Sequence, residues 1–462
     1  MPNSHRRLSD RCNRSDHHHA RDTRHTGNDT PANKGATVAA TARTLNTTGS
    51  TSVVLDAIRA AGTISRVGIA QVTGLTGATV STVVRKLLDA HLVIEIGRAE
   101  STGGKPRVLL ELNPTARYAV GVHLDHGAIT YAVTNLAGAP VARLARPGPG
   151  NASPADVVIR MADEINMLVE SIGIARDKLL GLGLVSPGPL SSRAGMHLTP
   201  PFMRSWEDFP LDTQLAEVAQ LPVLLENDAT AAAIGEYWSG GTQREESFAA
   251  LYLGTGLGAG IVINGTAYRG TSGNAGEIGH TCANIDGPEC WCGARGCFEA
   301  LAGPAAVVNE AYSDPRIVTA AALDTLGDHT PITQRFAAIA RASRMGDTPS
   351  RQLLERSARY VGVAAQSVAN LLDVRMLVLT GSSFAAASHI YVPAIRDTLA
   401  ASFFARDNHA VHVQLSQSAE TAPAIGAAAL VLQAQFVPER STSLAAKVRS
   451  SPHVSELSTL SP

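Results

Sequence analysis

The sequence lacks a long apolar run, an excess of charge of one sign and more than a few cysteines, and each absence excludes a class of protein. The longest apolar runs, such as Met376–Leu379, fall far short of the roughly 20 residues that cross a bilayer. The N-terminus carries no apolar signal core, so we expect a cytoplasmic protein with no membrane partner. The 39 Lys and Arg residues are balanced by 40 Asp and Glu residues, so any contact with nucleic acid must come from a local surface.

The five cysteines are unevenly placed. Cys12 stands alone, whereas the other four crowd into residues 282–297, which in such a chain indicates a metal site rather than a disulfide framework. One imidazole and three thiolates make a complete tetrahedral set for zinc: His280, Cys290, Cys292 and Cys297. With four protein ligands no position stays open for water, so the expected zinc is structural. The alternative is a group of buried free thiols.

The length predicts about three parts, at roughly 150 residues per domain. Residues 1–48 contain almost no large apolar side chain, which predicts a disordered arm. Its eight Lys and Arg residues against four acids could add a weak, salt-sensitive grip on DNA, and its His17–His19 run could bind a metal, although a plain solvated segment explains both. Residues 437–462 are predicted to be a second disordered tail. The folded parts are then 49–112 and 113–436.

Residues 49–112 have the pattern of three helices followed by a β-hairpin. Apolar residues at helical spacing predict the first helix, Ser65 predicts the N-cap of a second, and Thr76 that of a third. Two strands follow, Leu92–Ile96 and Val108–Leu112, joined by a glycine-rich basic loop, the wing. The third helix carries an apolar stripe that must face the other two helices: Val80, Val83, Val84, Leu87 and Leu88.

The opposite face of the third helix is small and polar, as a helix that enters a major groove requires. Three helices alone fit a packing or dimerisation module equally well, but such a module does not need the positive charge that the wing adds beside the third helix. The pattern therefore predicts a winged helix-turn-helix that binds DNA. The residues expected to contact DNA are Thr76, Ala78, Thr79, Ser81, Thr82 and Arg85 on the helix, and Lys105 and Arg107 on the wing.

Residues 113–436 alternate strands with helices, which is typical of an α/β fold with its site at the strand ends. A strand at Val223–Leu225 leads into Glu226-Asn227-Asp228 and an alanine-rich helix. A carboxylate beside an amide could bind hydroxyl groups or deprotonate one, or the pair could simply cap the helix. The glycine-rich run Gly254–Gly260 could hold a phosphate or form a tight hairpin.

Taken together, residues 117–436 resemble the ROK family of sugar kinases and sugar-responsive repressors. The preceding helices, with Gly104-Lys105-Pro106, resemble the winged helix of ROK repressors. The resemblance implies an α/β protein in which an N-terminal winged helix-turn-helix precedes a two-lobed, actin-like (ribonuclease H-like) domain of the sugar-kinase type. The motifs that carry it are Gly183–Pro189, Glu226–Ala229, Gly254–Gly260, Ala275–His280 and Cys290–Glu299.

The resemblance also implies a sugar site made by Asn227, Asp228, Glu277, His280 and Glu299. Carboxylates accept hydrogen bonds from several hydroxyl groups, and a zinc-bound imidazole presents its second nitrogen in a fixed orientation. In kinase members, the residue at the position of Asp228 would be the general base of phosphoryl transfer.

The chain departs from the kinase members at their phosphate-binding loop. Those members carry DxGGTK between the first two strands, where this sequence has His123–Ala128. Asp125 and His126 replace the two glycines, and a carboxylate a few Å from phosphate oxygens costs on the order of a few kcal/mol. The run Thr380–Ser383 is also short of glycine. We therefore expect no catalysis, with Asp228 left as a vestigial base.

These observations predict a sugar-responsive transcriptional regulator, a repressor that binds operator DNA and a sugar effector. Zinc is its expected structural cofactor, and a homodimer or homotetramer is its expected assembly. Two other classes stay open: an ATP-dependent sugar kinase with a fused DNA-binding domain, and a constitutive DNA-binding protein whose second domain only dimerises. The intact sugar-site residues argue against the last of these.

Overall fold

The computed structural model describes residues 49–98, 107–188, 190–191, 195–196, 201–239 and 245–436. All of them belong to one unit of the chain, Ala40–Pro462. The arm predicted at 1–48, the tail predicted at 437–462 and most of the predicted wing lie outside the described residues. What the sequence predicts for these segments stays a prediction.

The N-terminal elements follow the sequence pattern, with one added strand. They are α1 (Gly49–Ala61), β1 (Ile64–Ser65), α2 (Arg66–Thr73), α3 (Gly77–Asp89), β2 (Val93–Arg98) and β3 (Val108–Leu112). Ser65 accepts a hydrogen bond at Oγ from the Gly68 N–H, and Thr76 accepts one at Oγ1 from the Thr79 N–H, so both predicted N-caps are confirmed. The added strand β1 pairs with β3, which makes a three-stranded sheet of order β1-β3-β2.

α2 and α3 are bent by 120° relative to each other, in the range that a helix-turn-helix adopts. Along α3 the predicted apolar stripe is buried from Val80 to Leu87, and Leu88 at its end is half-buried. In the described part of the chain no single helix is long and apolar enough to cross a membrane. Among the described helices, the bent pair α2 and α3 meets the length and composition criteria when the two are taken together.

The first lobe is built on a five-stranded sheet of order β10-β7-β4-β5-β6. Its strands and covering helices are β4 (Tyr118–Leu124), β5 (Ala128–Asn135), β6 (Pro140–Pro147), α4 (Pro154–Ser171), β7 (Leu179–Ser186), α5 (Leu211–Ala219) and β10 (Val223–Asn227). A small hairpin of β8 (Leu190–Ser191) and β9 (Gly195–Met196) accompanies them. α4 and α5 bury their apolar faces against one side of the sheet, around Tyr131 and Trp206.

The second lobe is built on another five-stranded sheet, of order β13-β12-β11-β14-β15. Its strands are β11 (Phe248–Leu253), β12 (Leu257–Ile263), β13 (Thr266–Ala267), β14 (Met376–Thr380) and β15 (His412–Leu415). Its helices are α7 (Phe298–Ala302), α8 (Pro304–Ala311), α9 (Pro315–Ala320), α10 (Ile332–Arg344), α11 (Thr348–Leu372) and α12 (Ser382–Ser402). Leu353, Leu354 and Val361 of α11 are buried in this lobe, so its apolar stripe is core.

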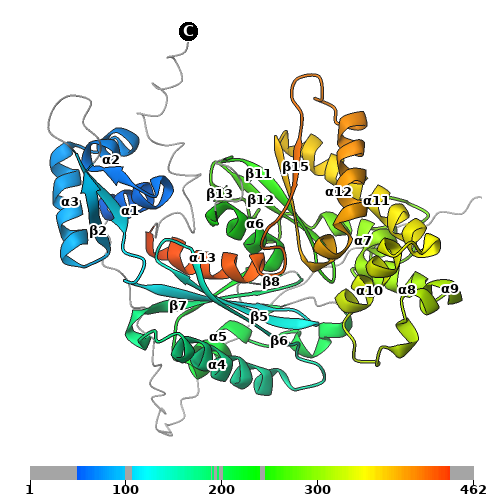
Figure 1. The fold of residues 1–462 in the computed structure, drawn as a ribbon. Helices are drawn as coiled ribbons and strands as arrows, with labels where there is room; N and C mark the ends of the chain where they lie inside the picture. The colour runs from blue at the N-terminus through cyan, green and yellow to red at the C-terminus, as the bar shows by residue number, and fades with distance from the viewer. Residues whose placement is uncertain are drawn as a thin grey trace, which may run out of the picture. The chain divides into compact units, whose positions relative to one another are not determined.

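The two sheets have the same topology. In each, three antiparallel strands are followed by two strands parallel to the first, so the β4–β5 turn of one lobe corresponds to the β11–β12 turn of the other. α13 (Ala422–Phe436) packs on the first sheet and α6 (Asp228–Trp238) on the second. These two alanine-rich helices also pack against each other, and thereby join the lobes (Figure 1).

Candidate functional site

A cavity of about 320 Å³, the cleft cavity, lies where β10 ends and the β11–β12 turn begins. Its volume lies at the lower end of the range for small-molecule sites, roughly 300 to 1,000 Å³. None of the described residues that line it is Lys or Arg, so its carboxylates face it without a cation. It is lined by all five residues that the resemblance assigned to a sugar: Asn227, Asp228, Glu277, His280 and Glu299.

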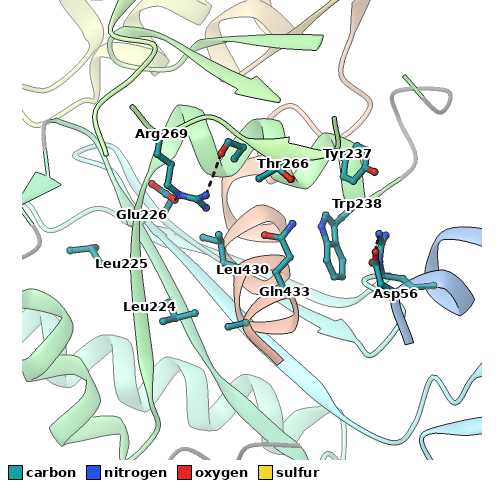
Figure 2. Close-up of a pocket in the computed structure, with 14 residues that line it drawn as sticks. Asp56, Leu224, Leu225, Glu226, Tyr237, Trp238, Thr266, Arg269, Leu430 and Gln433 are labelled. Atoms are coloured by element: carbon teal, nitrogen blue, oxygen red, sulfur yellow. Dashed lines mark hydrogen bonds and ion pairs between the residues drawn. The ribbon is translucent and has the colours of Figure 1, made fainter. Parts of the chain in front are cut away.

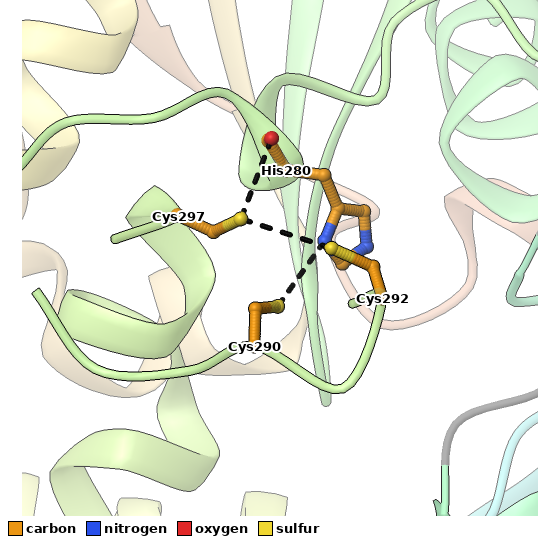
Figure 3. A group of neighbouring side chains, drawn as sticks. All are labelled: His280, Cys290, Cys292 and Cys297. Atoms are coloured by element: carbon orange, nitrogen blue, oxygen red, sulfur yellow. Dashed lines mark hydrogen bonds between the residues drawn. The ribbon is translucent and has the colours of Figure 1, made fainter. Parts of the chain in front are cut away.

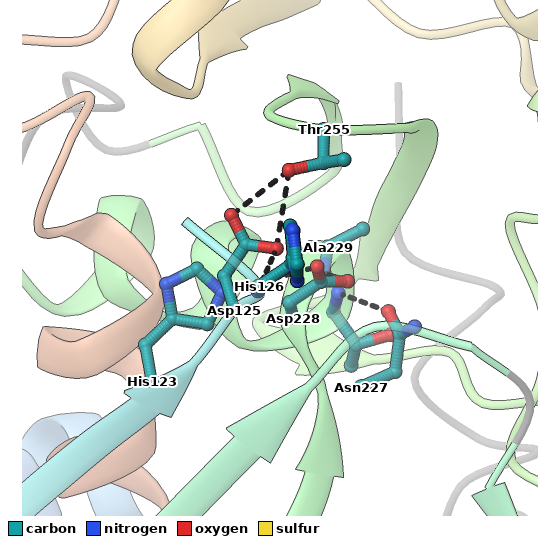
Figure 4. A network of polar contacts seen from close by, with 8 residues as sticks. His123, Asp125, His126, Asn227, Asp228, Ala229 and Thr255 are labelled. Carbon is teal, nitrogen blue, oxygen red and sulfur yellow. Dashed lines mark hydrogen bonds and ion pairs between the residues drawn. The ribbon is translucent and has the colours of Figure 1, made fainter. Parts of the chain in front are cut away.

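Asn227 and Asp228 lie at the junction of β10 and α6 (Figure 4). The Asn227 Oδ1 accepts a hydrogen bond of 3.1 Å from the Thr230 N–H, so this residue does cap the helix while its side chain lines the cavity. Burial raises the pKa of Asp228 to about 8, and the charges of Asp125 and Glu277 add to the effect. At neutral pH Asp228 therefore holds its proton and can donate a hydrogen bond.

Glu277 and Glu299 come later in the chain than Asp228, after β13, but their side chains line the same cavity. Burial raises the pKa of Glu277 to about 7, helped by the charge of Glu299. Glu299 is held at both oxygens, since Oε2 accepts from the Leu257 N–H at 2.9 Å and Oε1 accepts from the Trp291 Nε1–H at 2.7 Å. A Cβ at residue 256 would lie 2.5 Å from Glu299 Oε2, which explains Gly256 in the turn.

The four residues of the expected metal site lie together (Figure 3). Their ligand atoms all lie within 4.8 Å of one another. The distance from Cys290 Sγ to His280 Nδ1 is 3.5 Å, and that from Cys292 Sγ to Cys297 Sγ is 3.8 Å. Two thiolates that bind one tetrahedral zinc at about 2.3 Å lie about 3.8 Å apart, so donor set and spacing fit a metal ion. Cys282 is exposed and outside this group.

The β4–β5 turn, where kinase members carry their phosphate loop, holds a different network (Figure 4). Thr255 Oγ1, in the glycine-rich turn of the other lobe, donates to the Asp125 carboxylate, with distances of 3.1 and 3.0 Å to its two oxygens. His123 Nε2 lies 3.9 Å from Asp228 Oδ2 and is buried. Burial lowers the pKa of His123, although Asp125 opposes this, so the imidazole is neutral and no ion pair forms.

The predicted DNA-contacting residues of the helix lie on the solvent-facing side of α3. Ala78, Ser81, Thr82 and Arg85 are exposed, as is the cap residue Thr76, and Thr79 is half-buried. The hydroxyls of Ser81 and Thr82 donate to the carbonyls of Gly77 and Ala78, which leaves their oxygen lone pairs toward solvent. Arg107 is exposed immediately before β3, and Lys105 lies outside the described residues.

A second cavity, of about 260 Å³, lies between α1, α6, α13 and β10, and we call it the junction cavity (Figure 2). Arg59 of α1 is paired with Asp56 at 2.9 Å and lies over the ring of Trp238, 4.2 Å from its centroid. Arg269 is paired with Glu226 at 2.5 Å. Arg59 and Asp56 are three residues apart on α1, but the contacts of Arg59 with Trp238 and of Arg269 with Glu226 join separate elements, so no local spacing in the sequence indicates them.

Two sheets of one topology, joined by packed helices and enclosing a cavity lined by three acidic side chains, define an actin-like fold of the sugar-kinase type. The model of the ROK family matches residues 119–434, and the chain belongs to this family. The chain is 27% identical to the "Xylose repressor" of Bacillus subtilis (strain 168) over 80% of its own length and 91% of the relative's.

Two solved structures resemble the chain. A ROK family transcriptional regulator, described as a homolog of the E. coli MLC protein, has a TM-score of 0.66 at 23% identity and covers 86% of this chain and 99% of its own, which shows the fold. A ROK family glucokinase from Streptomyces griseus, in complex with glucose and AMPPNP, has a TM-score of 0.57 at 27% identity and covers 68% and 98%.

Proposed function

We propose that the protein is a sugar-responsive transcriptional repressor that binds operator DNA and catalyses no phosphoryl transfer. The observation that carries this proposal is the contrast within one cleft. All five polar residues of the sugar motif line the cleft cavity, whereas the turn that would hold phosphates carries Asp125 bonded to Thr255. The similarity to a xylose repressor over 80% of the chain supports it.

In this proposal a sugar binds to the carboxylates of Asp228, Glu277 and Glu299, with Asn227 and His280 completing the site. The protonated Asp228 donates to a sugar hydroxyl, while Glu299, already fixed by two donors, accepts from another. A structural zinc bound by His280, Cys290, Cys292 and Cys297 would hold the imidazole in place and keep the loop 280–299 in shape.

DNA binding is proposed for the exposed face of α3, from Thr76 to Arg85, together with Lys105 and Arg107 of the wing. A sugar that binds one arrangement of the lobes better than another would shift the population of the two and so move the DNA-binding helices of a homodimer or homotetramer. The repressor would then bind or release its operator.

The kinase alternative has one supporting observation, the similarity to a glucokinase solved with glucose and AMPPNP. One feature weighs against it. The carboxylate of Asp125 lies between the two turns, where it would repel phosphate oxygens.

Isothermal titration of the zinc-loaded protein against D-xylose, D-glucose and N-acetyl-D-glucosamine, and separately against ATP with magnesium, tests the proposal. We expect heat from one sugar and none from ATP, and a change in operator affinity when that sugar is added. Binding of ATP followed by sugar-dependent release of ADP would overturn it and make the protein a kinase.

A further inference from the structure

The two corresponding turns of the lobes are bonded directly to each other. Asp125 lies in the β4–β5 turn and Thr255 in the β11–β12 turn, 130 residues further along the chain. Thr255 Oγ1 lies 3.1 Å from one oxygen of the Asp125 carboxylate and 3.0 Å from the other (Figure 4). A single donor thus contacts both oxygens, and this contact crosses from one lobe to the other.

Both partners of this contact are held in place by their own lobes. The Asp125 N–H donates to the Ala128 carbonyl at 3.1 Å, and Oδ1 of the same residue accepts from the His126 N–H at 2.8 Å. In the other lobe, the Gly254 carbonyl accepts from the buried Ser383 hydroxyl at 2.8 Å, so the start of α12 fixes the turn that carries Thr255. The carboxylate and the hydroxyl therefore meet with little freedom to separate while the lobes keep this arrangement.

The first turn also touches the second lobe at another point. A Cβ at Gly127 would lie 2.9 Å from the Cβ of Pro331, and the neighbouring Ile332 lines the cleft cavity. The β4–β5 turn thus meets the second lobe at two points, Asp125 and Gly127.

The bonded hydroxyl is next to the sugar site. Thr255 and Gly256 line the cleft cavity, and the Leu257 N–H that follows them donates to Glu299. Asp125 itself is not among the residues that line the cavity. A change at Asp125 can therefore reach the cavity by moving the turn 254–257, or through the charge that helps to raise the pKa of Asp228.

We propose that Asp125 is a built-in anion that takes the place of a bound phosphate between the two turns and latches the lobes together, so that the cleft binds its sugar without a nucleotide. Asp125 is then a positioning residue, which acts on the sugar through Thr255. The inference rests on the proposed function, because its main readout is sugar affinity.

Sugar titration with D-xylose, D-glucose and N-acetyl-D-glucosamine tests the latch. A hydrogen bond to a charged group implies that Asp125→Ala or Thr255→Val weakens sugar binding by about tenfold or more. The double variant should be no weaker than the weaker single variant, because both changes remove one interaction. Thr255→Ser, which keeps the hydroxyl, should bind as the unaltered protein does. Asp163→Ala, at an exposed position of α4, is the matched control.

Chemical rescue separates the latch from a general loss of structure. Formate should restore sugar affinity to Asp125→Ala, since it supplies a carboxylate to Thr255, but not to the double variant. Losses that add in the double variant, or unchanged affinity in both single variants, would overturn the latch. Failure of formate to restore any affinity would do the same.

Hydrogen–deuterium exchange reads the latch without any sugar. In Asp125→Ala we expect the amides of residues 254–257, in the lobe that was not altered, to exchange at least several-fold faster than in the unaltered protein. Equal exchange rates would overturn the latch even if sugar binds. Faster exchange in a protein that binds none of the three sugars would keep the latch and count against the proposed function.

Discussion

The cleft cavity and the junction cavity treat their acidic residues in opposite ways. At the junction, Asp56 is paired with Arg59 and Glu226 with Arg269. In the cleft, the carboxylates of Asp228 and two glutamates face a cavity with no Lys or Arg among the described residues that line it. A paired carboxylate is compensated by its cation, whereas a buried carboxylate without a cation is energetically costly unless a ligand or a proton compensates it.

The two cavities are lined by neighbouring residues of one segment of the chain, so the contrast arises within a few residues. Glu226, at the end of β10, reaches Arg269 and the junction cavity, whereas Asp228, two residues later, lines the cleft cavity. α6 then runs 11 residues, or about 16 Å, from Asp228 to Trp238 beneath Arg59. One rigid helix therefore begins at the proposed sugar site and ends at the contact with the N-terminal helices.

The largest expected effect comes from breaking the metal group beside the cleft. Cys292→Ser should lose zinc and loosen residues 280–299, because a tetrahedral site with three ligands holds the ion far more weakly. We expect sugar response to be abolished while operator binding is retained. Zinc content, sugar titration and an operator mobility shift measure this, with the exposed Cys282→Ser as the matched control. Full sugar affinity in a zinc-free variant would contradict the assignment.

Replacing Asp228, a carboxylate of the cleft cavity, tests whether its ionised form lowers the stability of the folded protein. The folded protein keeps a proton on Asp228 up to about pH 8, whereas an unfolded chain releases it near pH 4. Between these values the folded state binds more protons, so this group makes the protein less stable as pH rises. Asp228→Asn removes that loss, and its stability relative to the unaltered protein should rise from pH 4 to 8, by at most about 5 kcal/mol.

Urea unfolding at pH 5 and pH 8.5 measures the effect of Asp228→Asn. The exposed Asp163→Asn serves as the control. We expect the difference in unfolding free energy between this variant and the unaltered protein to be the same at both pH values. A difference in unfolding free energy between Asp228→Asn and the unaltered protein that stays the same at both pH values would show that the carboxylate is not destabilised in the cleft.

At the junction cavity, removing a charged side chain should lower the stability of the protein rather than raise it. Arg59→Ala removes a contact with the face of Trp238 and leaves Asp56 without this cation, so we expect a loss of about 1 kcal/mol in the free energy of unfolding. Sugar affinity should not change, because the cleft residues are untouched. Arg66→Ala, which breaks an exposed ion pair with Glu95, should cost less. A tenfold loss of sugar affinity in Arg59→Ala would remove the distinction between the two cavities.

The sequence predicts those helix ends and strands that local residue patterns determine. The caps Ser65 and Thr76 and the strand Tyr118–Leu124 are confirmed, because capping groups and apolar runs act within a few residues. β6 was not predicted, since it is an edge strand whose residues are mostly exposed and show no apolar alternation. β1, with two residues, is too short to have a pattern.

The site was predictable where motifs carry it and not where distant segments meet. The five sugar-motif residues were found through the family resemblance, and the structure brings them to one cavity. The contact of Asp125 with Thr255 crosses 130 residues, and that of Glu226 with Arg269 crosses 43. Neither separation corresponds to a helix or strand spacing that the sequence could show. These pairs are therefore visible only in the folded structure.

The smallest effects are expected on α3, which lines neither cavity. Arg85 and Arg107 are exposed, and a side chain that contacts one phosphate contributes about one unit to the slope of operator affinity against salt. Arg85→Ala and Arg107→Ala should therefore each weaken operator binding several-fold, lower that slope by about one, and leave sugar affinity unchanged. Mobility shifts at several salt concentrations measure this, with the exposed Arg351→Ala of α11 as control. Unchanged operator affinity in both variants would remove this face of α3 and the wing from the proposed DNA surface. The difference between the two cavities would then have no demonstrated effect on DNA binding.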